Sequence, residues 1–494
     1  MNIVLVVFDS LRKDCVGGYN SSPSWGRVKT PYLDALANEA LVMTRVFPES
    51  LATLPARRAL YTGERVYPFV NSDFRHLKGD FVLDNIGPGW GPIPEDQDTI
   101  SELLQKSGYR TCLTSSVNHM FKPSKNFWRG FDQWDFVRGK EMDPYRSGPL
   151  PTQEEINYWL PPNMPNDERR VNLVNKGMMN VRELRVNLIT KELMNMREFM
   201  KHEENSIVAQ VMIKASKWLQ ENQDAKKFFL VVESFDPHEA WFVPKQYRLM
   251  YDNSNAHEQV LSLYEDISKM PPEILHRTQA NYSGLVSMCD RWFGYLYETM
   301  KNLGLLDNTI LIVTSDHGHS IGENNYMGKR GYPSTREVFD IPLLIRHPNK
   351  IGAGQKSDLL IQHTDISALI LDFAKVTPSK IIHGKKFWEN SVKNGKPIRD
   401  HVTVGWGTTM TVINDEWWLN CKISGRGAFL YDLNKDPLLK KNVAEEHQNV
   451  VDYLFSKGVD DAGGSFPDYL LQLEREGMDS PGCSPLASRS RYQK

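Results

Sequence analysis

The stretch Asn2–Ser10, NIVLVVFDS, indicates how this chain folds. Its apolar run is unbroken and rich in β-branched residues, which is typical of a strand covered on both faces in a parallel sheet. The run is too short to cross a membrane, and no basic segment precedes it as in a signal peptide. It ends at Asp9. We therefore predict a buried first strand that carries a carboxylate to one edge of a sheet.

Similar apolar runs recur along the chain, each next to a segment with helical spacing. Helices are predicted after Thr30 and after Thr99, where a hydroxyl residue precedes apolar residues at helical intervals. The further predicted strands are TCLTSS at 111–116, FFLVVES at 228–234, TILIVTS at 309–315 and IPLLIRHP at 341–348. Alternating helices and strands predict a doubly wound α/β domain.

The chain's 494 residues exceed what one compact core usually holds, so we expect a large domain and a smaller one. We assign residues 1–384 to the large domain and 385–478 to a C-terminal α+β domain of antiparallel strands, followed by a tail at 479–494. A polar, methionine-rich stretch at about 160–225 is predicted to be a helical insertion. It is either a surface layer or, alternatively, a substrate lid or a contact in a homo-oligomer.

Composition limits the partners and the compartment. The formal net charge is −2, so no overall field attracts nucleic acid or an anionic membrane surface. The odd number of widely spaced cysteines, without a CxxC motif, indicates reduced thiols. They are Cys15, Cys112, Cys289, Cys421 and Cys483. We predict a cytoplasmic protein that binds neither nucleic acid nor membranes.

Several predicted strands end in residues that bind metals or transfer protons. In an open parallel sheet, ligands bind outside the carboxyl ends of the strands, so these residues are expected to share one site. They are Asp9, the pair Asn118 and His119, the pair Asp236 and His238, and the pair Asp316 and His317. The two carboxylates and the imidazole of Asp9, Asp316 and His317 suit one divalent cation. The imidazole favours Mn²⁺, Zn²⁺ or Fe²⁺, and Ca²⁺ or Mg²⁺ remains possible.

The segment 53–63, TLPARRALYTG, offers a nucleophile. A hydroxyl next to a cation ionises more readily, and a helix N-terminus is a favourable place for an anionic substrate. Pro55 suits the first turn of such a helix, and Arg57 lies one turn further on. The alternative is that Thr53 only caps the helix, which is a common role for threonine.

These motifs together resemble the sulfatase-like hydrolases of the alkaline phosphatase superfamily, in the branch of sulfatases, phosphonate monoester hydrolases and phosphodiesterases. The resemblance rests on NIVLVVFDSLRKD, TLPARRALYTG, SFDPHEAW, TSDHGHSIGE, MGKRG and LYDLNKDP, which occur in the family's order between residue 2 and about residue 445. It implies an alkaline-phosphatase-like mixed sheet flanked by helices and a metal-dependent hydrolase of small anionic esters.

The resemblance also implies roles for single residues. The metal ligands would be Asp9, Thr53, Asp316 and His317. Among the other residues, Arg57 would hold the nucleophile, while Lys329 and His238 would contact the substrate oxygens or the leaving group. Asn118 and His119 stand where the family often has a Lys-x-His pair. We interpret His363 as a core residue.

Three departures from the family pattern affect the predicted reaction. The family converts a Cys or Ser to the aldehyde formylglycine, whereas Thr53 occupies that position here, and oxidation of a threonine would give a ketone. Ser10 replaces a second aspartate, which favours a single metal. Asn118 replaces a lysine, and the lower positive charge suits a monoanionic diester. We therefore predict hydrolysis of phosphodiesters or phosphonate monoesters. The alternatives are a sulfatase that works without formylglycine and a non-catalytic relative that binds anions.

Overall fold

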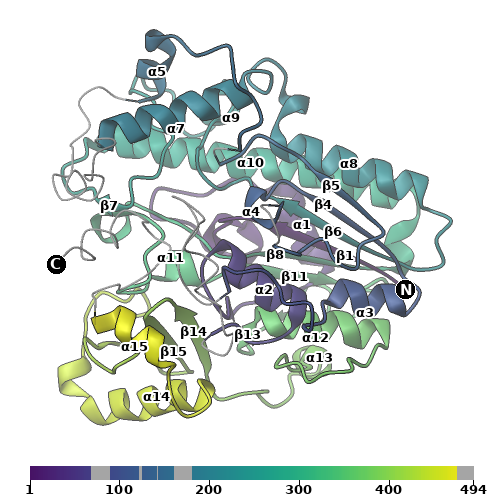
Figure 1. Cartoon of the computed structure of the whole chain (residues 1–494), viewed down its shortest axis with the longest axis vertical. Helices are drawn as coiled ribbons and strands as arrows, with labels where there is room; N and C mark the ends of the chain where they lie inside the picture. Colours follow the sequence, from purple (N-terminus) through teal and green to yellow (C-terminus); the bar gives the residue numbers. More distant parts are fainter. Residues whose placement is uncertain (68–88, 122–124, 142, 161–180, 476–494) are drawn as a thin grey trace.

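The computed structural model describes residues 1–67, 89–121, 125–141, 143–160 and 181–475. A mixed eight-stranded sheet runs through the large domain in the order β12-β2-β11-β8-β1-β6-β4-β5 (Figure 1). Its strands are β1 (Asn2–Phe8), β2 (Leu41–Met43), β4 (Arg110–Ser115), β5 (Gln133–Phe136), β6 (Phe228–Ser234), β8 (Thr309–Ser315), β11 (Leu343–Arg346) and β12 (Lys356–Ser357). Among them β11 runs antiparallel to both its neighbours, and the other pairs are parallel. The predicted α/β class is confirmed.

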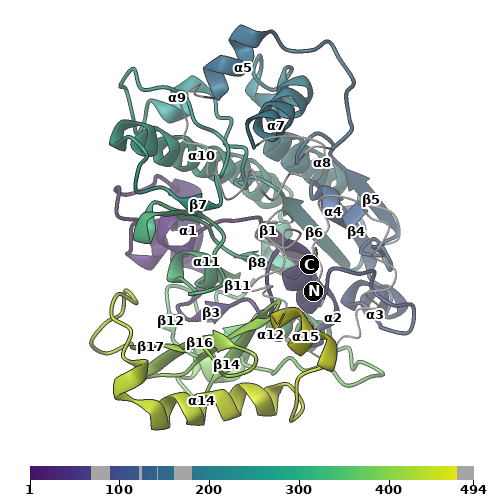
Figure 2. The same ribbon diagram turned by 60° about the vertical axis from the view of Figure 1, so that its left-hand side comes forward.

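Helices cover both faces of this sheet, as the continuous apolar strands require (Figure 2). Along β1, Val4, Val6 and Phe8 pack into one core and the residues between them pack into another. The first face carries α1 (Pro31–Glu39), α8 (Ile207–Glu221) and α10 (Pro272–Asn302), with α9 (Lys245–Arg248) packed on α10. The second face carries α2 (Thr53–Thr62), α3 (Ile100–Lys106) and α12 (His363–Ala374).

The predicted helical insertion at about 160–225 divides into unlike parts. Residues 161–180 lie outside the described residues, and α7 (Val181–Met196) and α8 follow. The apolar side of α8 is buried against β6 and α10, so α8 belongs to the layer that covers the sheet. Together with α5 (Gln153–Trp159), α7 lies further from the sheet (Figure 1).

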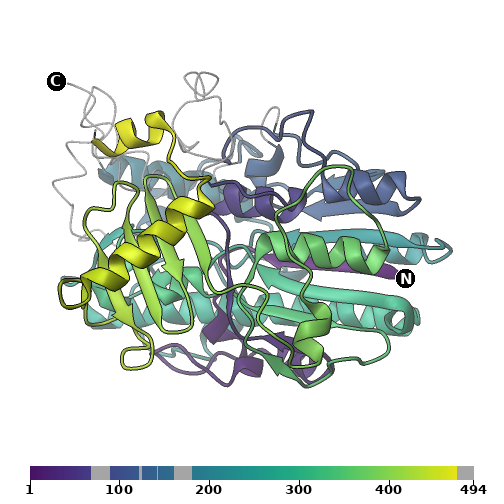
Figure 3. The same cartoon turned by 90° about the horizontal axis from the view of Figure 1, so that it is seen from below.

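The C-terminal region is a four-stranded antiparallel sheet with its own apolar core (Figure 3). Its strands are β14 (Val402–Trp406), β15 (Thr409–Ile413), β16 (Trp417–Lys422) and β17 (Phe429–Asp432), packed against α14 (Gln448–Asp461) and followed by α15 (Asp468–Arg475). The predicted tail at 479–494 lies outside the described residues.

The smaller elements connect these layers. They are β3 (Val46–Phe47), β7 (Glu265–Asp266), β9 (Ser320–Ile321), β10 (Tyr326–Gly328), β13 (Ile361–Gln362), α4 (Asn118–Phe121), α11 (Arg336–Phe339) and α13 (Trp388–Val392). Within the described residues, no helix is long and apolar enough to cross a membrane. The four described cysteines are buried and make no disulfides, and Cys483 lies outside the described residues.

Strand register fixes where the chemistry lies. In the parallel ladder Phe8 pairs with Ser234 on β6 and with Ser315 on β8. The residues that follow these strands, Asp9 and Asp316 among them, therefore meet at one edge of the sheet.

Candidate active site

Three ligand-type side chains meet where β1 and β8 end. Asp9, Asp316 and His317 are buried, and one ligand atom from each lies within 4.8 Å of the others. Among the described residues, this is the one group of three or more His, Cys, Asp or Glu with such spacing.

Backbone and side-chain hydrogen bonds fix the orientation of this cluster. Asp316 Oδ1 accepts hydrogen bonds from the amides of Ser10 and His317, at 3.0 and 2.8 Å. Asp9 Oδ1 accepts one from the Ser10 hydroxyl at 2.9 Å. His317 Nδ1 lies 2.9 Å from the carbonyl oxygen of Gly318, so this nitrogen carries the proton and Nε2 has a free lone pair. Burial lowers the pKa of His317 to about 3, which keeps the imidazole neutral.

A divalent cation fits these residues because buried polar atoms are left unsatisfied between them. Among the described residues, Asp9 Oδ2 and His317 Nε2 make no hydrogen bond, although both are buried. Buried polar atoms without a partner are uncommon in native proteins, and a bound cation would satisfy both of these. A carboxylate oxygen beside a neutral imidazole nitrogen is a suitable donor set for Mn²⁺, Zn²⁺ or Fe²⁺.

Arg57 lies behind this cluster, buried among three carboxylates. Its Nη1 atom lies 2.5 Å from Asp316 Oδ2 and 3.1 Å from Asp9 Oδ2, and its Nε lies 2.8 Å from Glu233 Oε2. The same Nη1 donates to the backbone carbonyl of Thr53 at 3.1 Å. Arg57 was expected to hold the nucleophile; the observed contact holds the backbone of Thr53.

Thr53 is the first residue of α2, and Ala52 occupies the N-cap position without a side-chain cap. The interpretation of Thr53 as only a helix cap is therefore wrong. The Thr53 side chain makes no hydrogen bond within the described residues, and the residue is 3% exposed. Its hydroxyl is left available at the positive end of a ten-residue helix, beside the cluster that Arg57 contacts.

Lys329 and His238 form a second buried pair, within electrostatic range of Asp9 and His317. Lys329 Nζ lies 2.6 Å from His238 Nε2. Burial lowers the pKa of His238 to about 4, and Glu239 opposes this shift. The pKa of Lys329 is raised: burial would lower it, but Glu239 and Asp9 outweigh that effect. Lys329 is therefore an ammonium that donates to a neutral imidazole.

The structure places Asn118 and His119 in the short helix α4, which follows β4. His119 forms an ion pair with Glu141. Burial opposes a low pKa for Glu141, but His119, His238 and Lys329 together lower that pKa to about 2. Asn118 is buried, and within the described residues no hydrogen bond or ion pair joins its side chain to the rest of the predicted set.

His363 is the first residue of α12 and lies beneath the end of β8. Its Nε2 atom lies 2.9 Å from the carbonyl oxygen of Ser315, and the side chain is buried. This position agrees with the interpretation of His363 as a core residue.

The sequence reasoning missed three glutamates at this site: Glu233, which is buried, and Glu141 and Glu239, which are half-buried. Glu233 accepts hydrogen bonds from both Arg57 and Tyr61, at 2.8 and 3.0 Å. Its signal was a lone acid inside the apolar strand FFLVVES, where an unpaired charge would be strongly unfavourable. Glu239, next to His238 in DPHEAW, had no comparable signal.

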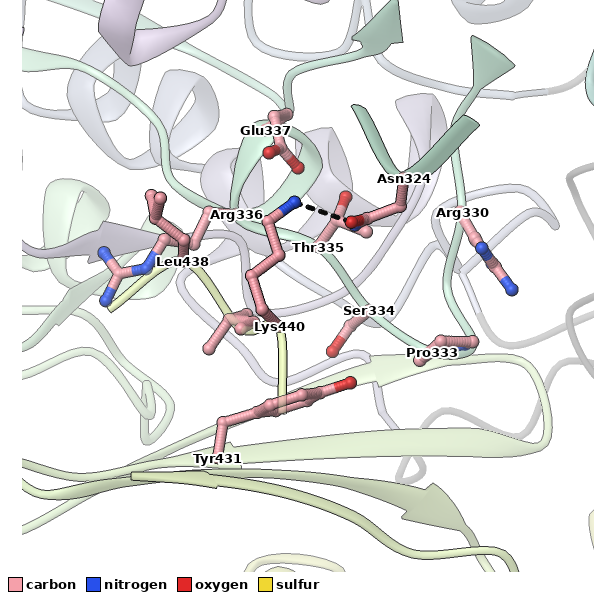
Figure 4. A pocket seen from close by; sticks show the side chains of 11 residues that line it. Asn324, Arg330, Pro333, Ser334, Thr335, Arg336, Glu337, Tyr431, Leu438 and Lys440 are labelled. Atoms are coloured by element: carbon pink, nitrogen blue, oxygen red, sulfur yellow. Dashed lines mark hydrogen bonds between the residues drawn. The ribbon is translucent and has the colours of Figure 1, made fainter. Parts of the chain in front are cut away.

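A separate pocket of about 150 Å³ lies at the junction with the C-terminal sheet (Figure 4). Tyr431 on β17 and the segment after Lys329 line it, and Lys440 donates to Asn324 Oδ1 at 2.7 Å across it. Arg336 pairs with Asp340 at 3.1 Å. Its lining also holds two buried atoms without a hydrogen bond, Arg336 Nε and Glu337 Oε2, but within the described residues it brings together no group of three or more His, Cys, Asp or Glu ligand atoms like the Asp9 cluster.

Comparison with known proteins gives the family of the chain. The sulfatase family model matches residues 1–376. An arylsulfatase of Clostridium perfringens is 24% identical over 490 residues, covering 92% of each chain. A multifunctional alkaline phosphatase superfamily protein of Trinickia caryophylli is 25% identical over 415 residues, covering 75% of this chain and 73% of its own.

The fold has counterparts among solved structures. The phosphonate monoester hydrolase of Agrobacterium radiobacter superposes with a TM-score of 0.67 at 20% identity, covering 93% of this chain and 95% of its own. At this identity the match shows a shared fold. It agrees with the predicted alkaline-phosphatase-like architecture of a mixed sheet with a smaller C-terminal antiparallel sheet.

Proposed function

This chain belongs to the sulfatase family and is a hydrolase of ester bonds, and from that premise we propose that it hydrolyses phosphodiesters or phosphonate monoesters with Thr53 as nucleophile. The observation that carries the proposal is Thr53 itself. It starts α2 beside the Asp9 cluster, with its hydroxyl unbonded within the described residues, at the position where formylglycine-dependent relatives need Cys or Ser.

The residues of the site divide the work between them. Asp9, Asp316 and His317, with the Thr53 hydroxyl, would hold one divalent cation. Such an ion lowers the pKa of a bound hydroxyl and offsets negative charge on the ester. Arg57 holds the start of α2 through the Thr53 carbonyl, at 3.1 Å, and thereby orients the hydroxyl for in-line attack. Lys329 supplies positive charge for the non-bridging oxygens.

Phosphorus esters and sulfate esters differ most in the second step of the reaction. Attack by Thr53 leaves an ester on its side chain, which water must open. Water can attack phosphorus in such an ester, and a buried imidazole such as His238 can take the proton. A sulfate ester of an ordinary secondary alcohol resists this step, because it has no hydrate oxygen that could expel sulfate. A phosphorus substrate therefore suits Thr53 better.

The charge around the substrate side supports a monoanion. Lys329 is offset by two nearby carboxylates, Glu141 and Glu239, both of which lie within electrostatic range of it. Asn118 adds no positive charge. The site therefore has little positive charge with which to neutralise a second negative charge on a substrate. A phosphodiester or a phosphonate monoester carries one negative charge, whereas a phosphate monoester carries two.

Sulfate ester hydrolysis without formylglycine remains the second candidate, because curated relatives such as the Clostridium perfringens protein bear the name arylsulfatase. A purely anion-binding role is disfavoured because the Asp9, Asp316 and His317 cluster is intact. The cytoplasmic location and the homo-oligomer stay predictions of the sequence.

Steady-state kinetics with the metal-loaded protein tests the proposal. Purified protein would be assayed with Mn²⁺, Zn²⁺, Fe²⁺, Mg²⁺ or Ca²⁺ against bis-4-nitrophenyl phosphate, 4-nitrophenyl phenylphosphonate, 4-nitrophenyl phosphate and 4-nitrophenyl sulfate. We expect kcat/KM for the diester or the phosphonate to exceed that for the sulfate at least about 100-fold. A higher kcat/KM for the sulfate would favour a sulfatase that works without formylglycine. Absence of turnover with every metal would favour the anion-binding role.

A further inference from the structure

We propose that Glu239 is a positioning residue that holds the His238 imidazole and stabilises its positive charge while a proton passes to the leaving group. This inference rests on the proposed function in one respect, namely that an ester oxygen departs on the His238 side of the site. It does not depend on whether phosphorus or sulfur is attacked.

The first support is the fixed orientation of the His238 ring. Phe235 stacks on it with ring centroids 4.2 Å apart. Nδ1 lies 2.6 Å from the backbone oxygen of Glu239 and 3.2 Å from its carboxylate oxygen Oε2. Nδ1 therefore carries a proton and faces the carboxylate, and Nε2 faces Lys329. The reacting nitrogen and the supporting carboxylate lie on opposite sides of one ring.

The second support is the way Glu239 itself is held. The Tyr264 hydroxyl donates to Glu239 Oε1 across 25 residues of chain. The other oxygen, Oε2, accepts no hydrogen bond within the described residues, although the side chain is only 11% exposed. Oε2 lies 3.2 Å from His238 Nδ1 and 3.6 Å from His319 Nδ1, and the closer approach to His238 places this carboxylate to stabilise a positive charge on that ring.

The other charged groups around His238 are already occupied. Lys329 donates to Nε2 at 2.6 Å, and Glu141 pairs with His119. Lys140 pairs with Asp236 at 2.8 Å and donates to the carbonyl oxygen of Ala240 at 3.1 Å, which holds the loop. Glu239 is thus the carboxylate within reach of the imidazole nitrogen that Lys329 does not contact.

When the bond between the leaving oxygen and the central atom breaks, His238 Nε2 gives that oxygen the proton that Lys329 had presented, and the leaving group departs as an alcohol. His238 is positively charged in transit, and Lys329 ends as a neutral amine. In the second step, the attacking water returns a proton to Lys329 through Nε2. Glu239 lowers the free energy of the charged imidazole in both steps.

A leaving-group series tests this role with matched controls. Glu239→Gln and Tyr264→Phe would be compared with Glu203→Gln and Tyr247→Phe. The second pair alters another Tyr–Glu hydrogen bond, 2.7 Å long, on the helical side of the domain. Each variant would be assayed with two esters of the same acid: the 4-nitrophenyl ester, whose leaving group departs without a proton, and the phenyl ester, whose leaving group needs one.

We expect Glu239→Gln to lower kcat for the phenyl ester about 10-fold more than for the 4-nitrophenyl ester. Tyr264→Phe should change the ratio in the same direction by a smaller factor, and the Glu203 and Tyr247 variants should not change it. On a His238→Ala background, Glu239→Gln should cause no further loss, because its effect acts through that ring.

Equal losses on both esters, or additivity with His238→Ala, would show that Glu239 only stabilises the fold and would overturn the inference. If the wild type hydrolyses aryl sulfates instead of the phosphorus esters, the proposed substrate class is wrong, and the same ratio measured on the sulfates still decides the role of Glu239. If no ester is turned over, both the proposed function and the role of Glu239 are wrong.

Discussion

Two buried arginines of this molecule, Arg57 and Arg277, both pair with carboxylates, but the polar atoms around them are satisfied to different degrees. Arg277 on α10 lies 2.6 Å from Asp252 and 2.7 Å from Glu258 and donates to the Ser254 carbonyl oxygen at 2.6 Å. Within the described residues, no polar side-chain atom of Arg277, Asp252 or Glu258 is left buried without a hydrogen bond.

The Arg57 cluster is not satisfied in this way. Three carboxylates surround one guanidinium, and three buried atoms have no hydrogen bond within the described residues: Asp9 Oδ2, Arg57 Nη2 and His317 Nε2. An ion-pair cluster in which every buried polar atom has a hydrogen bond stabilises the fold. Buried polar atoms that lack a hydrogen bond in the folded protein are available to bind a ligand, here a cation and an anionic ester.

The largest expected effect concerns Thr53. Thr53→Ala should lower kcat at least about 1,000-fold, because it removes the hydroxyl that forms the covalent ester. The melting temperature should change little, since the hydroxyl makes no hydrogen bond within the described residues. Thr53→Ser keeps a hydroxyl and should retain measurable turnover. Wild-type kcat in Thr53→Ala, confirmed by mass spectrometry, would remove Thr53 from the mechanism.

The next effect concerns the cation. Asp316→Asn should weaken Mn²⁺ binding more than about 100-fold by calorimetry and abolish turnover together with it, since a neutral amide is a poor ligand for a divalent ion. Asp252→Asn, in the satisfied cluster, should leave Mn²⁺ affinity and kcat of the folded protein unchanged. Full metal occupancy in Asp316→Asn would contradict the ligand assignment.

The two clusters should also respond oppositely in stability. In metal-free protein, Asp252→Asn should lower the free energy of unfolding by about 2 kcal/mol, because Arg277 loses a charged partner. Asp9→Asn should raise it by about 1 kcal/mol, because it removes one of three carboxylates crowded around Arg57. Urea unfolding with excess chelator measures both. A loss in both variants would mean that the Asp9 charge stabilises the fold.

A smaller effect is the pH dependence of the satisfied cluster. Burial would raise the pKa of Asp252, but hydrogen bonds from Arg277 and from the amide of Ser254 lower it to about 2. A carboxyl with a lowered pKa adds stability above its unfolded pKa, near 3.8, and that stability is lost as pH falls towards 2. The difference in unfolding free energy between wild type and Asp252→Asn should therefore be constant above pH 5 and shrink below pH 4. A constant difference down to pH 3 would contradict this pairing.

The sequence predicted the sheet-edge half of the site better than the loop half. Asp9 and Asp316 directly follow continuous apolar strands, and parallel strands must end at the same edge. The proximity of Asp9 and Asp316 can therefore be predicted from the pattern of apolar residues in the two strands. Thr53 and Arg57 were found through spacing within one helix and through family resemblance.

The remaining contacts depend on loops whose path no local pattern fixes. Tyr264 reaches Glu239 from a segment near β7, and Glu141 reaches His119 from the segment after β5. Glu233 was visible as an acid inside a strand, but its partner Arg57 is 176 residues away. Such pairings are set by packing in three dimensions, so the sequence could name a charged residue without naming its partner.

The most direct test of the central claim, that Thr53 acts as an ordinary hydroxyl nucleophile on phosphorus esters, is a burst experiment with metal-loaded enzyme whose Thr53 peptide has its unmodified mass. With bis-4-nitrophenyl phosphate or an aryl phosphonate, 4-nitrophenol release should continue in a steady state. With 4-nitrophenyl sulfate, release should stop at no more than one equivalent per enzyme, because a sulfate ester on Thr53 would not hydrolyse. Sustained release from the sulfate that exceeds the rate with the diester would contradict the account and identify the protein as a sulfatase that works without formylglycine.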